Sequence, residues 1–141
     1  MKEELAESST IKTAVFSLDS AYVEYISQRI DSGMQEFRPY CQPDFSVSSF
    51  SSLVRIPVHH LSHYLNTVSG QSFSDFRNSF RVRNAKQMIL EGKMDEMTIE
   101  SIGISSGFKS RTTFYRVFKN AEGITPGDFA ARTAENRSQD L

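Results

Sequence analysis

The sequence predicts an all-α protein in which one helical unit occurs twice, and two observations support this fold class. The first is an internal repeat: residues 68–76 (VSGQSFSDF) correspond to residues 121–129 (AEGITPGDF), 53 positions later (121 minus 68). The second is the spacing of the apolar residues before each segment, which recur every three or four positions, as on one face of a helix. A repeat of this length indicates two copies of one supersecondary unit.

The first copy is expected to be a helix-turn-helix at about residues 47–67. Its apolar positions keep helical spacing, break at Arg55, Ile56 and Pro57, and then resume. Proline suits the first turn of the second helix, because its missing N–H would have no partner there. The side chains of this second helix that we expect in the core are Val58, Leu61, Tyr64 and Leu65.

The second copy is expected to be a helix-turn-helix at about residues 98–119. Gly107 falls at its turn, and glycine readily adopts the left-handed backbone conformation that ends a helix. The second helix of this copy then directs Phe114, Val117 and Phe118 toward the core. Each copy is followed by a glycine and by a Ser or Thr with an Asp three positions later, a pattern that resembles a capping box and predicts another helix.

The segments outside the two copies are expected to differ in character. Residues 1–19 show no periodic pattern, and we expect a flexible lead or linker there. From about Ser20 to Tyr40 the apolar residues recur at helical spacing, which predicts an opening helix that covers the first helix-turn-helix. A helix for dimerisation or coupling is the alternative for that segment. Residues 133–141 are expected to form a polar tail.

The combined pattern resembles the AraC-type (AraC/XylS) transcription regulators over about residues 34–131. Among the motifs that carry the resemblance are Leu61–Ser62, Gly107–Phe108, Phe114…Phe118–Lys119 and Gly123-x-Thr125–Pro126. The resemblance implies a DNA-binding domain over residues 20–132, with two helix-turn-helix subdomains joined by one long connecting helix. The repeating apolar positions place that helix at about residues 73–90. They are Phe76, Phe80, Ala85, Met88 and Ile89.

The outward faces of the two second helices carry the side chains expected to contact DNA. The base-reading candidates are His59, Ser62 and His63 in the first unit, and Arg111, Thr112, Tyr115 and Arg116 in the second. Most of these match positions from which members of the family read bases. Their chemistry fits, because arginine can bind guanine through two N–H groups and His, Ser and Thr can bond several base edges. The candidates for phosphate contacts, which position the protein without specifying a sequence, are Asn66, Lys109, Ser110 and Lys119.

The net charge of the chain, −1, is not typical of a strongly basic nucleic-acid binder, and we expect weak nonspecific binding to DNA. Residues 43–132 contain eleven Lys and Arg and eight Asp and Glu, a net charge of +3, so the acidity lies outside the predicted DNA-binding part. The resemblance implies double-stranded DNA as the partner, and the mild basicity indicates that it is bound through few phosphate contacts and through helix N-termini. The near-neutral total leaves one alternative: a protein–protein interaction module with weak or no DNA binding.

Further partners follow from the resemblance. A transcription regulator of this family is expected to contact RNA polymerase. Many members carry a sensory domain, soluble or membrane-bound, before the DNA-binding module. Only about forty residues precede the first helix-turn-helix here, which is too short for a separate domain. The chain therefore either lacks a sensor or is the end of a longer protein.

Other chemistry is not expected from this sequence. His59 and His63 share a helix face, but two imidazoles without a nearby Cys, Asp or Glu make an incomplete zinc site, so no metal is expected. Protonation of either imidazole near a phosphate would favour binding below neutral pH. His60 is expected to pack rather than to contact a base. No catalytic constellation or phosphate-binding Gly-rich loop occurs, so neither an enzyme nor a cofactor is expected. The lack of a long apolar run and the single Cys41 suit the cytoplasm.

Overall fold

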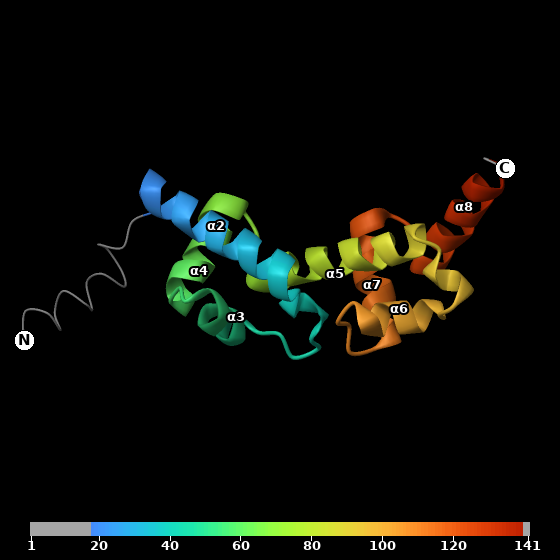
Figure 1. The fold of residues 1–141 in the computed structure, drawn as a ribbon, viewed down its shortest axis with the longest axis horizontal. Coiled ribbons are helices and arrows are strands. Elements are labelled where there is room, and N and C mark those ends of the chain that lie inside the picture. The colour runs from blue at the N-terminus through green and yellow to red at the C-terminus, as the bar shows by residue number, and fades with distance from the viewer. Residues whose placement is uncertain (1–17, 140–141) are drawn as a thin grey trace, which may run out of the picture. The chain divides into compact units, whose positions relative to one another are not determined.

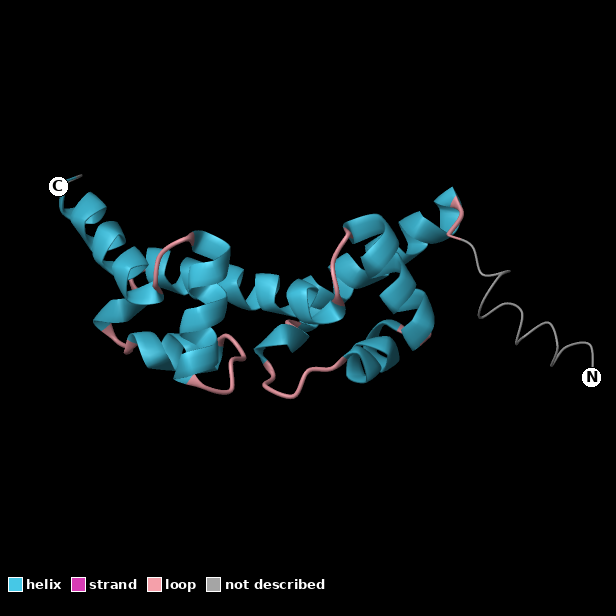
Figure 2. Cartoon of the chain, turned by 180° about the vertical axis from the view of Figure 1, so that it is seen from behind, coloured by secondary structure: helices cyan, strands magenta, loops and turns pink. Residues whose placement is uncertain are grey.

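The computed structural model describes residues 18–139, and every regular element in that range is a helix (Figure 1, Figure 2). The α-helices are α2 (Ser20–Phe37), α3 (Val47–Val54), α4 (Val58–Tyr64), α5 (Phe73–Leu90), α6 (Ile99–Ser105), α7 (Arg111–Glu122) and α8 (Pro126–Gln139). Shorter helical turns are η2 (Pro39–Cys41), η3 (Leu65–Ser69) and η4 (Lys93–Asp95). The predicted fold class is confirmed: the protein is all-α, with two helix-turn-helix units, α3–α4 and α6–α7, and the long helix α5 between them. Most of the predicted N-terminal lead lies outside the described residues.

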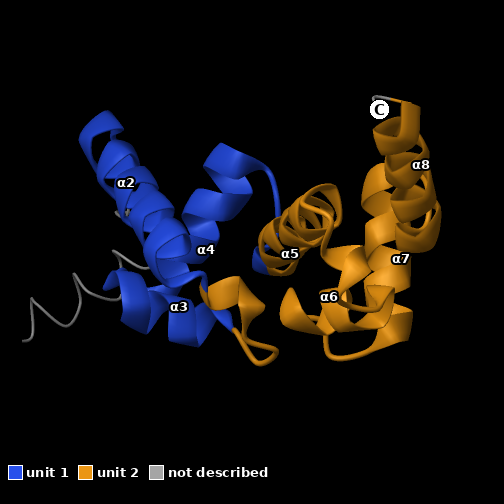
Figure 3. Cartoon of the chain, turned by 45° about the vertical axis from the view of Figure 1, so that its right-hand side comes forward, with its two compact units in different colours: residues 1–38, 46–73 blue, residues 39–45, 74–141 orange. Residues whose placement is uncertain are grey.

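The chain divides into two compact units, coloured blue and orange in Figure 3. The first unit contains residues 1–38 and 46–73, and therefore holds α2, α3 and α4. The second contains residues 39–45 and 74–141, and holds nearly all of α5 together with α6, α7 and α8. Each unit thus contains one of the two predicted helix-turn-helix copies.

In the first unit, α2 packs on the helix-turn-helix, as the spacing of its apolar residues predicts. The helix begins after Asp19, whose carboxylate accepts a hydrogen bond from the N–H of Tyr22 at 2.8 Å, and it ends at Arg38 in the left-handed conformation (φ 47°). One face of α2 joins the core of this unit, where burial of apolar surface supplies the main stabilisation. The buried apolar side chains of the unit are Ile26, Ile30, Met34, Phe50, Val54, Ile56, Leu61, Tyr64 and Leu65.

Arg55 forms the turn of the first helix-turn-helix. It occupies the place of Gly107 in the second copy, and its backbone is left-handed (φ 60°) although it carries a side chain. Ser51 secures this helix end twice: its carbonyl oxygen accepts the N–H of Arg55 at 2.8 Å, and its hydroxyl donates to the carbonyl of Ile56 at 2.6 Å. The backbone of the turn therefore has the conformation that glycine usually adopts. The two hydrogen bonds of Ser51 stabilise it in the presence of the arginine side chain.

The second helix of this unit is longer than one α-helical segment. After Tyr64 it continues as a π-helical turn, η3, to Ser69 and ends at Gly70 with φ 68°. A π-helical turn is wider than an α-helical turn and is often found at functional sites. The widened turn lies next to the predicted DNA-facing residues of this helix.

In the second unit, α5 and the helix-turn-helix share one aromatic core. Its buried members are Val82, Ala85, Ile89, Ile102, Phe108, Phe114 and Phe118. The α6 and α7 helices approach closely at Gly103, where an added Cβ would overlap the ring of Phe114. Glycine at this helical position costs about 1 kcal/mol in helix propensity relative to alanine. The close approach explains why a residue with a side chain does not stand there.

Arg81 of α5 is a buried cation, with 4% of its surface exposed. Its Nε donates to the carbonyl of Tyr40 at 2.7 Å, and its Nη2 donates to those of Gln42 (2.8 Å) and Pro43 (3.3 Å). Burial lowers the pKa of Arg81 to about 10, with a further lowering by Arg77, so the side chain is still charged near neutral pH. The guanidinium thereby anchors residues 39–45 to α5.

The last helix, α8, extends beyond the predicted domain end at residue 132. Its start is capped as expected, since the hydroxyl of Thr125 accepts the N–H of Asp128 at 3.1 Å. It continues to Gln139 through residues expected to form a polar tail. Residues 134–139 are exposed. The segment is thus polar as expected, but it is helical as far as the structure describes it.

Candidate nucleic-acid interface

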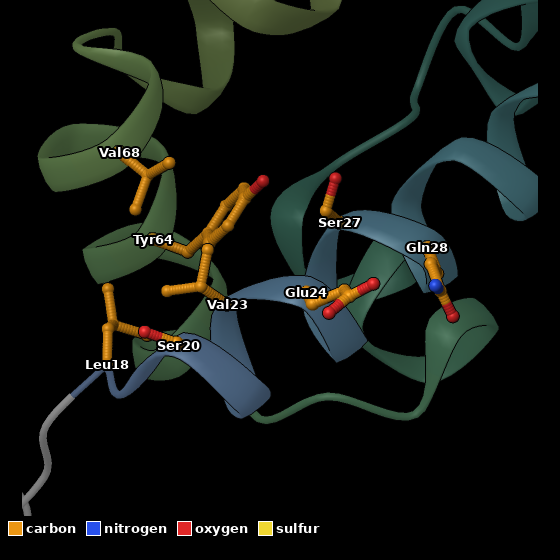
Figure 4. Close-up of a pocket in the computed structure, with 8 residues that line it drawn as sticks. All are labelled: Leu18, Ser20, Val23, Glu24, Ser27, Gln28, Tyr64 and Val68. Carbon is orange, nitrogen blue, oxygen red and sulfur yellow. The ribbon is translucent and has the colours of Figure 1, made fainter.

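The outer face of α4 and η3 carries the base-reading candidates of the first unit. The orientation of this helix is set by Leu61, Tyr64 and Leu65, which are buried. Figure 4 shows Tyr64 beside Val23 of α2, at the edge of a shallow hollow between the two helices. The opposite face is consequently turned outward: His59, His63 and Asn66 are exposed and Ser62 is half-buried. Val58, expected in the core, is instead 38% exposed, because it lies in the first turn, ahead of the buried stripe.

His60 differs from its two histidine neighbours, as expected. Its Nδ1 is hydrogen-bonded to the hydroxyl of Tyr22 on α2 at 2.6 Å, and the two rings meet edge-on. Burial lowers the pKa of the His60 imidazole below its ordinary 6.5, and His59 and His63 lower it further. His60 therefore contributes to the packing of α4 on α2, which leaves His59 and His63 as the outward imidazoles.

The N-terminal half of α7 carries the candidates of the second unit. Arg111, Thr112 and Arg116 are exposed, and so are the phosphate candidates Lys109 and Lys119. Ser110 has a role that the sequence reasoning missed: its hydroxyl accepts the N–H of Thr113 at 3.2 Å and caps the start of α7. Capping orders the first turn of the helix, whose remaining N–H groups attract anions.

Tyr115, predicted to be an exposed base reader, is half-buried. Its ring packs edge-on against Phe114, with ring centres 5.8 Å apart, and it borders the aromatic core of the unit. Its other neighbour is Arg111, whose Cζ lies 4.2 Å from the centre of the Tyr115 ring. Helical spacing alone put Tyr115 on the outer face, but a large ring at the border of that face reaches back to the core.

Glu100 is a further residue of this surface that the sequence reasoning did not single out. It lies near the start of α6, and its Oε1 accepts a hydrogen bond from Nε of Arg111 at 2.9 Å. This hydrogen bond lowers the pKa of the Glu100 carboxyl. It also raises the pKa of the Arg111 guanidinium, and Tyr115 raises that pKa further. Eleven positions separate the two residues, so no helical spacing pointed to the pair.

Neither a metal site nor a membrane-spanning helix occurs in the part of the chain that the structure describes. Within residues 18–139, no group of three or more His, Cys, Asp or Glu side chains is arranged to hold a metal ion. In the same range, no helix has both the length and the apolar character needed to cross a membrane. Neither finding adds a residue to the candidates on the outer faces of α4, η3 and α7.

Two helix-turn-helix units on one chain define a DNA-binding domain: the second helix of each turns polar side chains outward, and those of α7 include Arg and Lys. Residues 50–132 match the profile of a family described as a helix-turn-helix domain. The chain belongs to the AraC family of bacterial transcription regulators and contains the DNA-binding domain of that family.

Two curated proteins are among its relatives. The uncharacterized HTH-type transcriptional regulator YtdP of Bacillus subtilis is 33% identical over 76 residues, which cover 51% of this chain and 10% of that protein. The arabinose operon regulatory protein of Escherichia coli is 29% identical over 92 residues, which cover 65% of this chain and 30% of that protein. The chain thus spans less than a third of the length of these relatives.

A solved structure shows the same fold. A transcriptional regulator of Chromobacterium violaceum, described as having an AraC-type DNA-binding domain, aligns with a TM-score of 0.65 at 18% identity. The alignment covers 82% of this chain and 97% of the other. At this level of identity the likeness concerns the fold alone.

Proposed function

We propose that this domain reads two adjacent major-groove segments of double-stranded DNA, with α4 and its extension η3 as one recognition helix and α7 as the other. The observation that carries the proposal is the same in both units. The second helix of each helix-turn-helix buries one face in its own core and turns polar side chains outward, which on α7 include the cations Arg111, Arg116 and Lys119. This is the arrangement by which a recognition helix presents side chains to base edges.

Each recognition helix has its own base-reading residues in this proposal. His59, Ser62 and His63 contact bases from the first helix, and Arg111, Thr112 and Arg116 contact bases from the second. Arg111 and Arg116 are the residues best suited to guanine, because a guanidinium can bond O6 and N7 together. Tyr115 is assigned here to the support of Arg111, since its ring is already in contact with that side chain.

The phosphate contacts are proposed to come from the edges of the same surfaces. Lys109 and Lys119 are exposed cations beside α7, and Asn66 is exposed on the first helix. Ser110 would act through the capped N-terminus of α7 rather than through a free hydroxyl. Such contacts fix the position of the protein on the duplex.

The wider partners are also proposals. Because the curated relatives are much longer than this chain, a sensory domain in the same protein is consistent with their length. A regulator that binds a promoter would meet RNA polymerase there, and it would work in the cytoplasm, where bacterial DNA is. These assignments rest on family membership.

A salt titration tests the DNA-binding proposal. The full chain is titrated into a labelled duplex of random sequence at several salt concentrations, followed by fluorescence anisotropy. Log affinity should fall linearly with log salt concentration, by about 0.9 for each phosphate neutralised. The alternative, a protein–protein interaction module, predicts no binding even at low salt, and that result would refute the proposal.

A further inference from the structure

We propose that Glu100 is a positioning residue for base reading: it fixes the guanidinium of Arg111 so that this side chain meets a base edge rather than a phosphate. The inference rests on the proposed function, because it concerns how one of the proposed base readers is held. It adds a specificity-determining residue that lies on α6, outside the recognition helix itself.

Two neighbours hold Arg111 from different directions. The Oε1 of Glu100 lies 2.9 Å from Nε, and Cζ lies over the Tyr115 ring, 4.2 Å from the ring centre. Tyr115 is four positions after Arg111 on α7 and is itself held by its edge-on contact with Phe114. The two contacts together therefore restrict the position of the guanidinium, although 62% of the Arg111 side chain is exposed.

The hydrogen bond to Glu100 does not involve the terminal Nη groups of Arg111. Guanine is recognised by two N–H groups in one plane, and the two terminal Nη groups of arginine provide such a pair. The bond to Glu100 is made by Nε, on the side of the group. A long side chain that is already oriented loses less conformational freedom on binding.

The negative charge of Glu100 has a second, separate effect on DNA binding. A carboxylate beside Arg111 offsets its attraction for phosphates, which are the same in every DNA sequence. Its repulsion weakens binding to all DNA, whereas the orientation of Arg111 strengthens binding only where a guanine is in place. The repulsion therefore lowers both affinities alike, and only the orientation of Arg111 increases the difference in affinity between a preferred site and random DNA.

Removal of Glu100 tests the inference. A preferred site is first selected from a randomised duplex library with the full wild-type chain. The affinities for this site and for a scrambled duplex are then measured for wild type, Glu100→Ala, Arg111→Ala and the double variant. Glu96→Ala is the matched control, since it removes one exposed carboxylate of the same unit that has no contact with Arg111 in the structure.

We expect Glu100→Ala to reduce the ratio of the two affinities by about three- to fivefold, the scale of one exposed ion pair. Glu96→Ala should leave the ratio unchanged, and Glu100→Ala should cause no further loss when Arg111 is already alanine. In the free protein, the Nε–H signal of Arg111 in nitrogen-15 NMR spectra should broaden or shift toward that of an unbonded arginine in Glu100→Ala.

Three outcomes would overturn the inference. Equal changes of both affinities in Glu100→Ala would show a pure charge effect, and a loss of discrimination that persists without Arg111 would show that Glu100 acts elsewhere. A change in unfolding alone would leave only a structural ion pair. The proposed function fails separately, and takes the inference with it, if selection with the wild-type chain yields no preferred sequence.

Discussion

The ring of Phe114 lies directly against the backbone of Gly103, in the space that a Cβ at that position would occupy. Gly103 belongs to α6 and Phe114 to α7, so this contact sets how closely the two helices of the second helix-turn-helix approach. Phe114 is 1% exposed and packs against Phe108 and Phe118 at the centre of the unit. The position of the second recognition helix therefore depends on a residue without a side chain.

Gly103→Ala should destabilise the protein although alanine is the better helix former. The added methyl group would force the Phe114 ring to move within a packed core, at a cost of about 1–3 kcal/mol that exceeds the gain in propensity of about 1 kcal/mol. Gly127→Ala in α8 is the control, because its Cβ would have neighbours no nearer than 3.9 Å. Urea unfolding should show a loss for the first variant and none for the second; equal effects would contradict the packing argument.

Arg55→Gly should stabilise the first unit. Arg55 has a left-handed backbone at a helix end, where a side chain costs about 1–2 kcal/mol and glycine costs little. After the greater freedom of glycine in the unfolded chain is allowed for, we expect a net gain in stability of about 0.5–1 kcal/mol.

Gly70→Ala is the reverse substitution, because it adds a side chain to a left-handed residue. Gly70 has φ 68° and open space around its Cβ position, so a loss there measures backbone strain alone. Differential scanning calorimetry should show melting temperatures that shift in opposite directions.

Arg81→Met should destabilise the second unit by about 2–4 kcal/mol. The substitution keeps an unbranched side chain but removes the donors to Tyr40, Gln42 and Pro43, and the buried carbonyl of Tyr40 loses this hydrogen bond. Arg83→Met is the matched control on the same helix. Arg83 is exposed and lies over the ring of Phe80, so its loss should cost no more than about 1 kcal/mol. Similar denaturation midpoints for the two variants would refute the anchoring role of Arg81.

The first unit should lose stability in mild acid because of His60. Its pKa is lower in the folded protein than the ordinary 6.5, so the unfolded chain binds a proton more readily than the folded one. The contribution of the neutral imidazole is therefore complete above about pH 6.5 and is lost as the pH falls through the lower folded pKa. Urea midpoints of wild type and His60→Gln, compared at pH 7.5 and pH 5.5, measure it. A difference between the two proteins that does not change with pH would exclude this linkage.

Arg116 and Lys119 should respond differently when they are replaced by alanine. Arg116→Ala should weaken binding to a preferred site by about 1–3 kcal/mol and should relax the preference at one base. Lys119→Ala should weaken preferred and random DNA alike and should reduce the slope of log affinity against log salt by about 1. Electrophoretic mobility shifts with single-base variants of the site distinguish a base contact from a phosphate contact. Equal losses on both DNAs for Arg116→Ala would make it a phosphate contact.

The repeat made most of the fold predictable, because helical spacing and turn residues are local features of the sequence. The same reasoning placed Tyr115 outside and Val58 inside, since a period of 3.6 residues assigns a face but not the reach of a side chain. The hydrogen bond from the Ser51 hydroxyl to the Ile56 carbonyl was also not predictable, because it depends on the conformation of a turn that helix propensities do not specify. Long-range partners such as Glu100 with Arg111, or Arg81 with Tyr40, have no sequence signal at all. The DNA contacts themselves remain predictions.

The anchoring of residues 39–45 by Arg81 has a consequence for any attempt to divide the molecule. This short segment packs with the second unit, yet the chain before it and the chain after it both belong to the first. A single cut after residue 73 would leave the later fragment without the carbonyl groups that Arg81 needs, whereas a cut before residue 46 would deprive α3 and α4 of α2. No single break in the polypeptide therefore separates two complete units. A fragment intended to isolate one helix-turn-helix unit must also contain residues that belong to the other unit.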